Sequence, residues 1–270
     1  MVADTQPYKV WDTDDASDYA ELMRMIPSDF VQALPRRELY GSTEADELGL
    51  TPVEAVPDVL ILPDQYDEKI KEAHDQQNMP VYHMRATWRP PGYKYNQDGI
   101  GYCWTWGGTG CFMTTRACED KDTVFLAPVS MGYLVGWADR GNYLGSFIQG
   151  AREQGICPAV DGNMNDLRGS ASVWNAVGRR DEFKLDLVWD TRSSAMKQHC
   201  VSILCYGRSL YVAYNWWGHA VELVGILIRP DGTWEWWISN SHNEPDIIVL
   251  TGSRAIPSEA YGFISTVMAA

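Results

Sequence analysis

The chain has 270 residues, of which 45% are hydrophobic and 12% aromatic, enough for a sizeable core in one large domain with or without an extension. Its 36 acidic and 22 basic residues leave a net charge of −14, which argues against binding to a phosphate backbone. No apolar run approaches the roughly 18 residues that span a bilayer. The first residues, Met1–Pro7, lack the basic and apolar regions of a secretory signal. We therefore expect no nucleic-acid partner, no membrane span and no export by a signal peptide.

Acidic residues are concentrated in the first part of the chain. Residues 1–80 contain 18 Asp and Glu against 6 Lys and Arg, whereas residues 81–270 contain 18 against 16. Eleven of the twelve Trp residues also lie after position 80. We therefore expect an acidic N-terminal extension over 1–80 and a packed domain over 81–270. Apolar residues in Asp14–Met25 and Val59–Leu62 are costly to leave in water, which favours docking of the extension over a free tail.

Short helices and loops precede a run of strands, which is typical of an α+β protein and not of an alternating α/β one. The spacing of apolar residues predicts helices at Asp14–Met25, Gln65–Asp75, Cys103–Ala117, Tyr143–Gln154 and Ser170–Ala176. β-branched and aromatic residues predict strands at Val201–Leu204, Leu210–Tyr214, His219–Ile228, Thr233–Ser239 and Ile247–Leu250. Glycines at 107, 108 and 110 weaken the third helix by roughly 1 kcal/mol each relative to alanine, so we expect tertiary packing to hold it.

A tight hairpin is predicted at Arg229–Thr233, where Pro-Asp-Gly lies between two of the strands. If the turn centres on Asp231, Asn240 lies opposite Glu222. His219 and Asn240 then lie at the same end of the hairpin, offset by about three residues or roughly 10 Å along the strands. We expect a bulge or strand curvature to close that gap.

The six cysteines are expected to be free thiols rather than three disulfides, because the chain shows no export signal. His199, Cys200 and Cys205 come nearest to a metal cluster, but a fourth ligand is not evident. Burial in a strand at Val201–Leu204 explains the two cysteines more simply. The sequence therefore predicts neither a metal nor a cofactor.

Cys103 is the strongest candidate for a nucleophile, because it lies between a glycine-rich loop and the start of a helix. Amides and the dipole at a helix start stabilise an anion, so we expect the pKa of this thiol to be lowered. His219 opens an apolar strand, either as a half-buried structural residue or as the base of a Cys-His site. Asn240 supplies the third polar group that such a site needs to orient the imidazole.

These residues carry a family resemblance. The segment Asn96–Trp104, Asn-Gln-Asp-Gly-Ile-Gly-Tyr-Cys-Trp, resembles the signature of papain-like cysteine peptidases, with Gln97 six residues before Cys103. Gly218–Val221 looks like the histidine block of that family, and Trp236–Ser241 resembles its apolar run into Asn-Ser. The chain order of Cys, His and Asn agrees as well. The sequence around Cys103 looks most like that of the branch encoded by bacteriophages, as do the sequences of Asn215–His219 and Leu250–Pro257.

The resemblance implies a papain-like two-lobed fold, with a helical lobe that contains the Cys-bearing helix and a β-rich lobe that carries His and Asn. Cys103 would attack an amide carbonyl, and His219 would pair with the thiolate and later protonate the leaving amine. Asn240 would hold the imidazole ring, while Gln97 and the Cys103 backbone N–H would stabilise the oxyanion. The resemblance implies a protein or peptide substrate and no cofactor.

A bacteriophage protein of this kind would lie in the host cytoplasm, the virion or both. Residues 1–80 would then dock to other virion proteins or act as a propeptide-like segment. The sequence shows no match to the usual propeptide helices, which favours docking.

The sequence also departs from the family pattern. Ile100 stands where most members have a disulfide cysteine, which suits a reducing compartment. His242 stands where the family places a Trp that shields the Asn–His contact, and Gly141-Asn142 is the nearest counterpart of the substrate-binding Gly-Gly. Two alternatives therefore stay open beside an active peptidase. One is a structural virion protein that retains the fold with weak or no activity, and the other is a cell-wall amidase or endopeptidase.

Overall fold

A single seven-stranded sheet runs through the protein in the computed structural model, which describes residues 8–25, 60–90, 93–122, 124–159, 183–191, 195–242 and 245–267. The strands are β1 (Val10–Asp12), β2 (Leu185–Asp190), β3 (Leu210–Tyr214), β4 (His219–Ile228), β5 (Trp234–Ser239), β6 (Ile247–Thr251) and β7 (Glu259–Thr266). Their order in the sheet is β1-β6-β5-β4-β3-β7-β2. β1 pairs with β6 in parallel, and the other neighbouring pairs are antiparallel.

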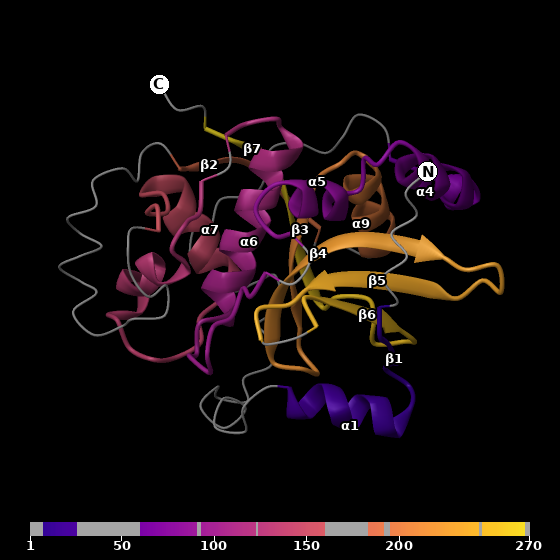
Figure 1. The fold of residues 1–270 in the computed structure, drawn as a ribbon, viewed down its shortest axis with the longest axis horizontal. Helices are drawn as coiled ribbons and strands as arrows, with labels where there is room; N and C mark the ends of the chain where they lie inside the picture. Colours follow the sequence, from indigo (N-terminus) through magenta and orange to yellow (C-terminus); the bar gives the residue numbers. More distant parts are fainter. Residues whose placement is uncertain are drawn as a thin grey trace.

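Helices cover both faces of this sheet (Figure 1). They are α1 (Ala16–Arg24), α4 (Tyr66–Asp75), α5 (Pro80–Ala86), α6 (Cys103–Cys118), α7 (Leu144–Glu153) and α9 (Met196–Cys205), with the 3-10 helices η1 (Pro63–Gln65) and η2 (Pro128–Val135). α6 and α7 lie on the face of Tyr211, whose hydroxyl donates to the Trp104 carbonyl at 2.6 Å and whose ring packs on Phe147. α9 lies on the other face, where Ile203 meets Gly262 of β7. The expected α+β fold is confirmed.

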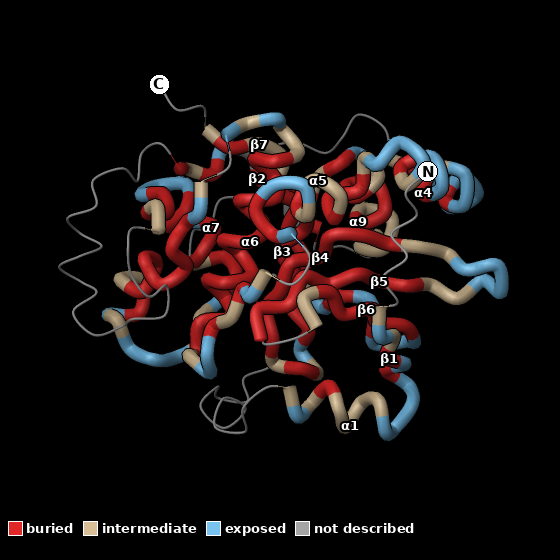
Figure 2. The backbone as a smooth tube through the Cα atoms, in the orientation of Figure 1, coloured by how far each residue is buried: buried red, intermediate tan, exposed pale blue. Residues whose placement is uncertain are grey.

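Helix α6 is buried from Cys103 to Ala117, and its glycines explain how the sheet comes so near (Figure 2). A Cβ at Gly107 would lie 2.9 Å from the Cα of Val221 in β4, and one at Gly108 would lie 2.4 Å from the Phe147 ring. The intrinsic cost of glycine in a helix is offset here by tertiary packing, as expected. The first residue of α6, Cys103, is thereby held beside the first residues of β4.

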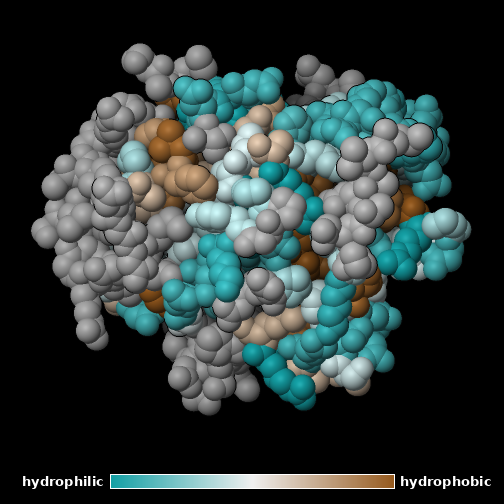
Figure 3. Space-filling view, in the orientation of Figure 1, coloured by the Kyte–Doolittle hydropathy of each residue, from teal (hydrophilic) through white to brown (hydrophobic). Residues whose placement is uncertain are grey.

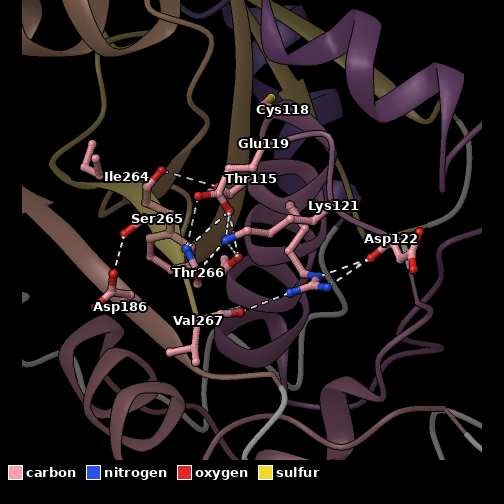
Figure 4. A network of polar contacts seen from close by, with 12 residues as sticks. Thr115, Cys118, Glu119, Lys121, Asp122, Asp186, Ile264, Ser265, Thr266 and Val267 are labelled. Carbon is pink, nitrogen blue, oxygen red and sulfur yellow. Dashed lines mark hydrogen bonds and ion pairs between the residues drawn. The ribbon is translucent and has the colours of Figure 1, made fainter. Parts of the chain in front are cut away.

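The far end of α6 is tied to β7 by a polar network (Figure 4). The Glu119 carboxylate accepts from the backbone N–H of Thr266 at 3.2 Å and from its hydroxyl at 2.7 Å. Lys121 donates to the Thr266 carbonyl at 2.5 Å, and Arg116 donates to the carbonyls of Asp122 and Val267. These bonds satisfy backbone groups of Asp122, Thr266 and Val267 and hold them beside the end of the helix.

The described parts of the first 80 residues pack against the rest of the chain. The β1 strand extends the sheet beside β6, and the Trp217 indole donates to the carbonyl of Leu22 in α1 at 2.9 Å. Leu22 is fully buried, and Tyr19 lies 5.4 Å from the Trp216 ring. Further along, the backbone N–H of Ile61 donates to a hydroxyl on α9. These contacts combine apolar and aromatic packing with hydrogen bonds, including those from Ser253 to the Asp14 carboxylate.

The outer surface is mainly hydrophilic over the described face in Figure 3. The exposed large apolar side chains of the described ranges are scattered along the chain: Leu62, Phe125, Tyr143, Tyr206 and Ile256. Within those ranges, no helix combines the length and the apolar character needed to cross a bilayer.

Several sequence predictions need correction. Val201–Leu204 belongs to helix α9 and not to a strand, because its apolar residues serve a helix that is buried on nearly every side. α5, β1, β2 and β7 were not expected, and the helix expected at Ser170–Ala176 lies outside the described residues. The β4–β5 hairpin has the expected register at Gly225–Trp237, but a bulge between Leu223 and Gly225 shifts the pairing by one residue.

Replacing Gly107 tests the close approach of α6 to β4. Gly107→Ala should destabilise the protein by about 1–3 kcal/mol, because the new methyl group meets strand backbone that has no freedom to move aside. Chemical denaturation measures the loss. The exposed substitution Lys71→Ala on α4 is the control and should change the free energy of unfolding by less than about 0.5 kcal/mol. Equal stability of Gly107→Ala and the wild type would contradict this packing.

Candidate active site

The three expected residues Cys103, His219 and Asn240 lie at the ends of three elements that meet at one end of the interior strands β4 and β5. Cys103 begins α6, His219 begins β4, and Asn240 follows β5. The β-bulge brings the last two nearer than the sequence predicted. Glu222 pairs with Ser239 and not with Asn240, so the offset between His219 and Asn240 falls from three residues to two. The expectation that a bulge closes the gap is confirmed, whereas the expected pairing of Asn240 with Glu222 is wrong.

His219 and Asn240 are joined by a hydrogen bond between Nε2 and Oδ1 of 3.1 Å. The Asn240 Nδ2 donates to the carbonyl of His242 at 2.8 Å, so the amide oxygen is the atom that faces the imidazole. Since that oxygen can only accept, the proton of the neutral ring belongs on Nε2. Nδ1 then has a lone pair, and it is buried without a hydrogen-bond partner in the described structure. This is the tautomer that a general base needs.

The imidazole is enclosed between two rings. Trp217 meets it edge-on with centroids 4.9 Å apart, and the His242 ring lies tilted at 4.9 Å. His242 thus occupies the covering position for which the family pattern has a Trp. Burial lowers the pKa of His219 well below its usual value, the His242 ring lowers it further, and the Asn240 bond acts in the opposite direction. Burial also lowers the pKa of His242 to about 4. Both rings are therefore neutral at pH 7.

The Cys103 thiol lies beside the backbone of Ala220, the residue that follows His219. Only 5% of Cys103 is exposed, and burial raises the pKa of its thiol to about 11. The backbone N–H groups of Ala220, Trp104 and Cys103 lower this pKa, but by less than burial raises it. The expectation of a lowered pKa is wrong for this structure, because loss of water outweighs the helix-start amides. No hydrogen bond joins this thiol to His219. The thiol and the imidazole are therefore both neutral in this structure.

Gln97 lies beside the segment that follows β5 and is fully buried. Its Nε2 donates to the Ile100 carbonyl at 2.7 Å, and its Oε1 accepts from the Ser241 hydroxyl at 2.7 Å. The backbone N–H of Gln97 donates to the Ser241 carbonyl at 2.8 Å. The loop that carries Gln97 is thus bound directly to the segment that carries Asn240.

Sequence reasoning missed one buried group at this site, Arg89, which binds the strand end at Ser239 and Asn240. A single arginine between Trp88 and Pro90 gives no pattern that would reveal such a contact. Sequence reasoning did single out His242, but not its contact with the His219 ring.

All six cysteines are free thiols, and Cys200 and Cys205 lie in helix α9. Within the described ranges, no three His, Cys, Asp or Glu residues lie close enough together to hold a metal ion.

Comparisons with known proteins bear on the fold. No family model matches the sequence, and no curated protein matches it either. The structure is similar to that of the Amb a 11 cysteine protease, a ragweed pollen allergen, in its proform, with a TM-score of 0.54 and 13% identity over 84% of this chain and 74% of that one. A second structure of that proform gives a TM-score of 0.50 and 14% identity over 78% and 67%. Digestive procathepsin L 3 of Tenebrio molitor gives 0.47 and 13% over 89% and 90%. The fold of this chain is papain-like.

Alkylation of Cys103 as a function of pH tests the state of the thiol. Because the pKa is raised to about 11, labelling by iodoacetamide should be slow at pH 6 and should rise steadily through pH 9 and 10. Peptide mass spectrometry would follow each cysteine. Cys103 should still react before Cys200, whose thiol pKa burial raises to about 12. Complete labelling of Cys103 at pH 6 would instead reveal a thiolate–imidazolium pair.

His242→Phe tests the burial of the neutral second ring. The unfolded chain binds a proton at His242 near pH 6.5, whereas the folded chain binds it near pH 4, so stability is lost as the pH falls between these values. Phenylalanine does not titrate. We therefore expect the wild type to lose stability relative to His242→Phe from pH 7 to 4, by up to roughly 3 kcal/mol. Denaturant titrations at four pH values measure this, and parallel pH curves for the two proteins would contradict it.

Proposed function

We propose that the protein is a cysteine peptidase that hydrolyses peptide bonds through Cys103, His219 and Asn240. The observation that carries the proposal is the bond between His219 Nε2 and Asn240 Oδ1, which leaves Nδ1 without a hydrogen-bond partner, while Ala220, the next residue, lies beside the Cys103 thiol. A papain-like fold supports it, because that fold places a Cys-bearing helix against a β-rich lobe with a His and an Asn. Fold alone does not specify an activity, so the site geometry supplies the argument.

In the proposed reaction, the Cys103 sulfur attacks the carbonyl carbon of a peptide bond while its proton passes to His219 Nδ1. The tetrahedral intermediate collapses when His219 returns that proton to the leaving amine, which forms an acyl-enzyme and the first product. A water molecule then attacks the acyl carbon, with His219 as base, and the second product leaves with a carboxyl group. Asn240 keeps the ring in the required tautomer throughout.

The oxyanion would form at the first turn of α6. The Cys103 backbone N–H lies in the first turn of the helix, where amides and the helix dipole stabilise a negative charge. Gln97 is the proposed second donor. An amide nitrogen carries two hydrogens, and the Ile100 carbonyl accepts one of them. The other would donate to the oxyanion once a substrate displaces the groups that now cover the site.

A second candidate function is a structural role with a silent site, as expected for a virion component. The closure of the site favours it, since His219 is 2% exposed and the thiol pKa is raised. A bacteriophage origin, docking of residues 1–80 to other virion proteins and a location in the host cytoplasm or the virion stay predictions from the sequence. So does the cell-wall amidase or endopeptidase alternative, which loss of turbidity of purified peptidoglycan would reveal.

Substitutions at the site separate an active peptidase from a silent one. On any peptide that mass spectrometry shows to be cleaved, Gln97→Ala should lower kcat by about 10²–10³, because it removes an oxyanion donor. His219→Ala should lower it further, Asn240→Ala less, and Cys103→Ser should abolish cleavage.

Cys200→Ser in α9 is the matched control and should cleave at the wild-type rate, because it lies on the other face of the sheet. Cleavage that persists in Cys103→Ser would rule out this site. Failure to find any cleaved peptide, together with no labelling of Cys103 by a peptidyl chloromethyl ketone, would favour the structural alternative.

A further inference from the structure

Arg89 presents both ends of its guanidinium to the end of β5. Its Nη1 donates to the Ser239 hydroxyl at 2.6 Å, and its Nη2 donates to the Asn240 carbonyl at 2.6 Å. Both bonds are short, as charge-assisted bonds are, and a planar guanidinium holds its two donors in a fixed relation. The fork therefore fixes the strand end in one orientation and not merely at one point.

The position of Arg89 is itself well determined. Its backbone N–H donates to the Met84 carbonyl of α5 at 2.9 Å, and its guanidinium lies 5.3 Å from the centre of the Tyr95 ring. The Tyr95 hydroxyl donates to the Trp106 carbonyl of α6 at 2.9 Å. Arg89 thus links the helix that carries Cys103 to the strand end that carries Asn240.

A charged group in this place is expensive, because Arg89 is only 1% exposed. Burial lowers the pKa of its guanidinium, and the carboxylates of Asp246 and Glu222 act in the opposite direction. A hydrophobic side chain would fill the space without that cost. What it could not do is bind the Ser239 hydroxyl and the Asn240 carbonyl together.

The Asn240 segment is held from both sides. Arg89 binds it at residues 239 and 240, and Gln97 binds it at Ser241. The Asn240 side chain is then left with two partners, His219 and the carbonyl of His242. With its backbone held by Arg89, the amide can turn away from the imidazole only by breaking its own bonds to His219 and to the His242 carbonyl.

We propose that Arg89 is a positioning residue that holds Asn240 against His219 and so sets the tautomer of the imidazole. Its meaning for catalysis rests on the proposed function, but the positioning itself does not. Arg89 acts through Asn240 and touches no reacting atom.

The direct test is the tautomer of His219, measured by ¹⁵N NMR on the full chain at pH 7.5, which needs no turnover. In the wild type the Nε2-protonated form should dominate. Arg89→Lys keeps a charge but loses the fork, and Arg89→Gln loses both. The ratio of Nε2- to Nδ1-protonated ring should fall by about 3–10-fold in Arg89→Gln, the equilibrium value of one hydrogen bond, and by less in Arg89→Lys.

Three further variants separate positioning from general destabilisation. In the Asn240→Ala background, Arg89→Lys should cause no additional change in the ratio, because the residue through which it acts is gone. Arg116→Lys is the matched control: this arginine is 5% exposed and also donates to backbone carbonyls, but at the other end of α6. It should lower stability and leave the ratio unchanged. Ser239→Ala removes one acceptor of the fork with little effect on packing, and should lower the ratio by about 2-fold.

An unchanged tautomer ratio in Arg89→Lys and Arg89→Gln would overturn the proposal, as would an equal fall in Arg116→Lys. If neither Arg89 variant folds, an unchanged ratio in Ser239→Ala overturns it. The outcome is independent of peptidase activity. A shifted ratio without any cleaved peptide would leave the positioning role intact and remove the proposed function, whereas cleavage with an unchanged ratio would remove only the positioning role.

Discussion

The close approach of helix α6 to strand β4 is the constraint on which the rest of the site depends. Gly107 lets the helix backbone lie against Val221, and this places Cys103, one turn earlier, beside Ala220 and hence beside His219. A larger side chain at this position would require the helix and the strand to move apart, because a Cβ there would lie 2.9 Å from the Val221 Cα. Catalytic geometry tolerates little displacement, since a shift of about 1 Å can cost 10²-fold in rate. The three glycines lower the intrinsic helix propensity of α6, but Gly107 allows the close approach that places Cys103.

Burial sets the charge state of the site. The thiol and both imidazoles are neutral in the structure, because burial removes the hydration that stabilises their charged forms and the neighbouring groups compensate for only part of this loss. The polar groups behind them are organised differently. Arg89 stays charged and is bound to the strand end, and the amide of Asn240 is satisfied on both sides. Arg89 and Asn240 thus form a rigid polar support behind the neutral, buried Cys103 and His219. This arrangement suits a proton transfer from Cys103 to His219 that begins only when a substrate enters the site.

The sequence predicted the parts of the fold whose signals are local. The hairpin at Pro230-Asp231-Gly232, helix α6 and the order of Cys103, His219 and Asn240 follow from turn residues and short motifs. Other features depend on distant contacts. Val201–Leu204 looks like a strand because α9 is buried almost all round. In β7, Gly262 breaks the run of β-branched and aromatic residues, and its lack of a side chain leaves room for Ile203. The raised thiol pKa and the two-pronged contact of Arg89 with the end of β5 arise only once the chain is folded.

A crystal structure of the protein after reaction with a peptidyl chloromethyl ketone tests the central claim most directly. The account predicts a covalent bond from the reagent to the Cys103 sulfur, with His219 Nε2 still bonded to Asn240 and Nδ1 facing the new thioether. It also predicts a rearrangement of the groups that cover the thiol, since Cys103 is 5% exposed before reaction. Attachment of the reagent to another cysteine, or a His219 ring turned away from Asn240 in the adduct, would contradict the account.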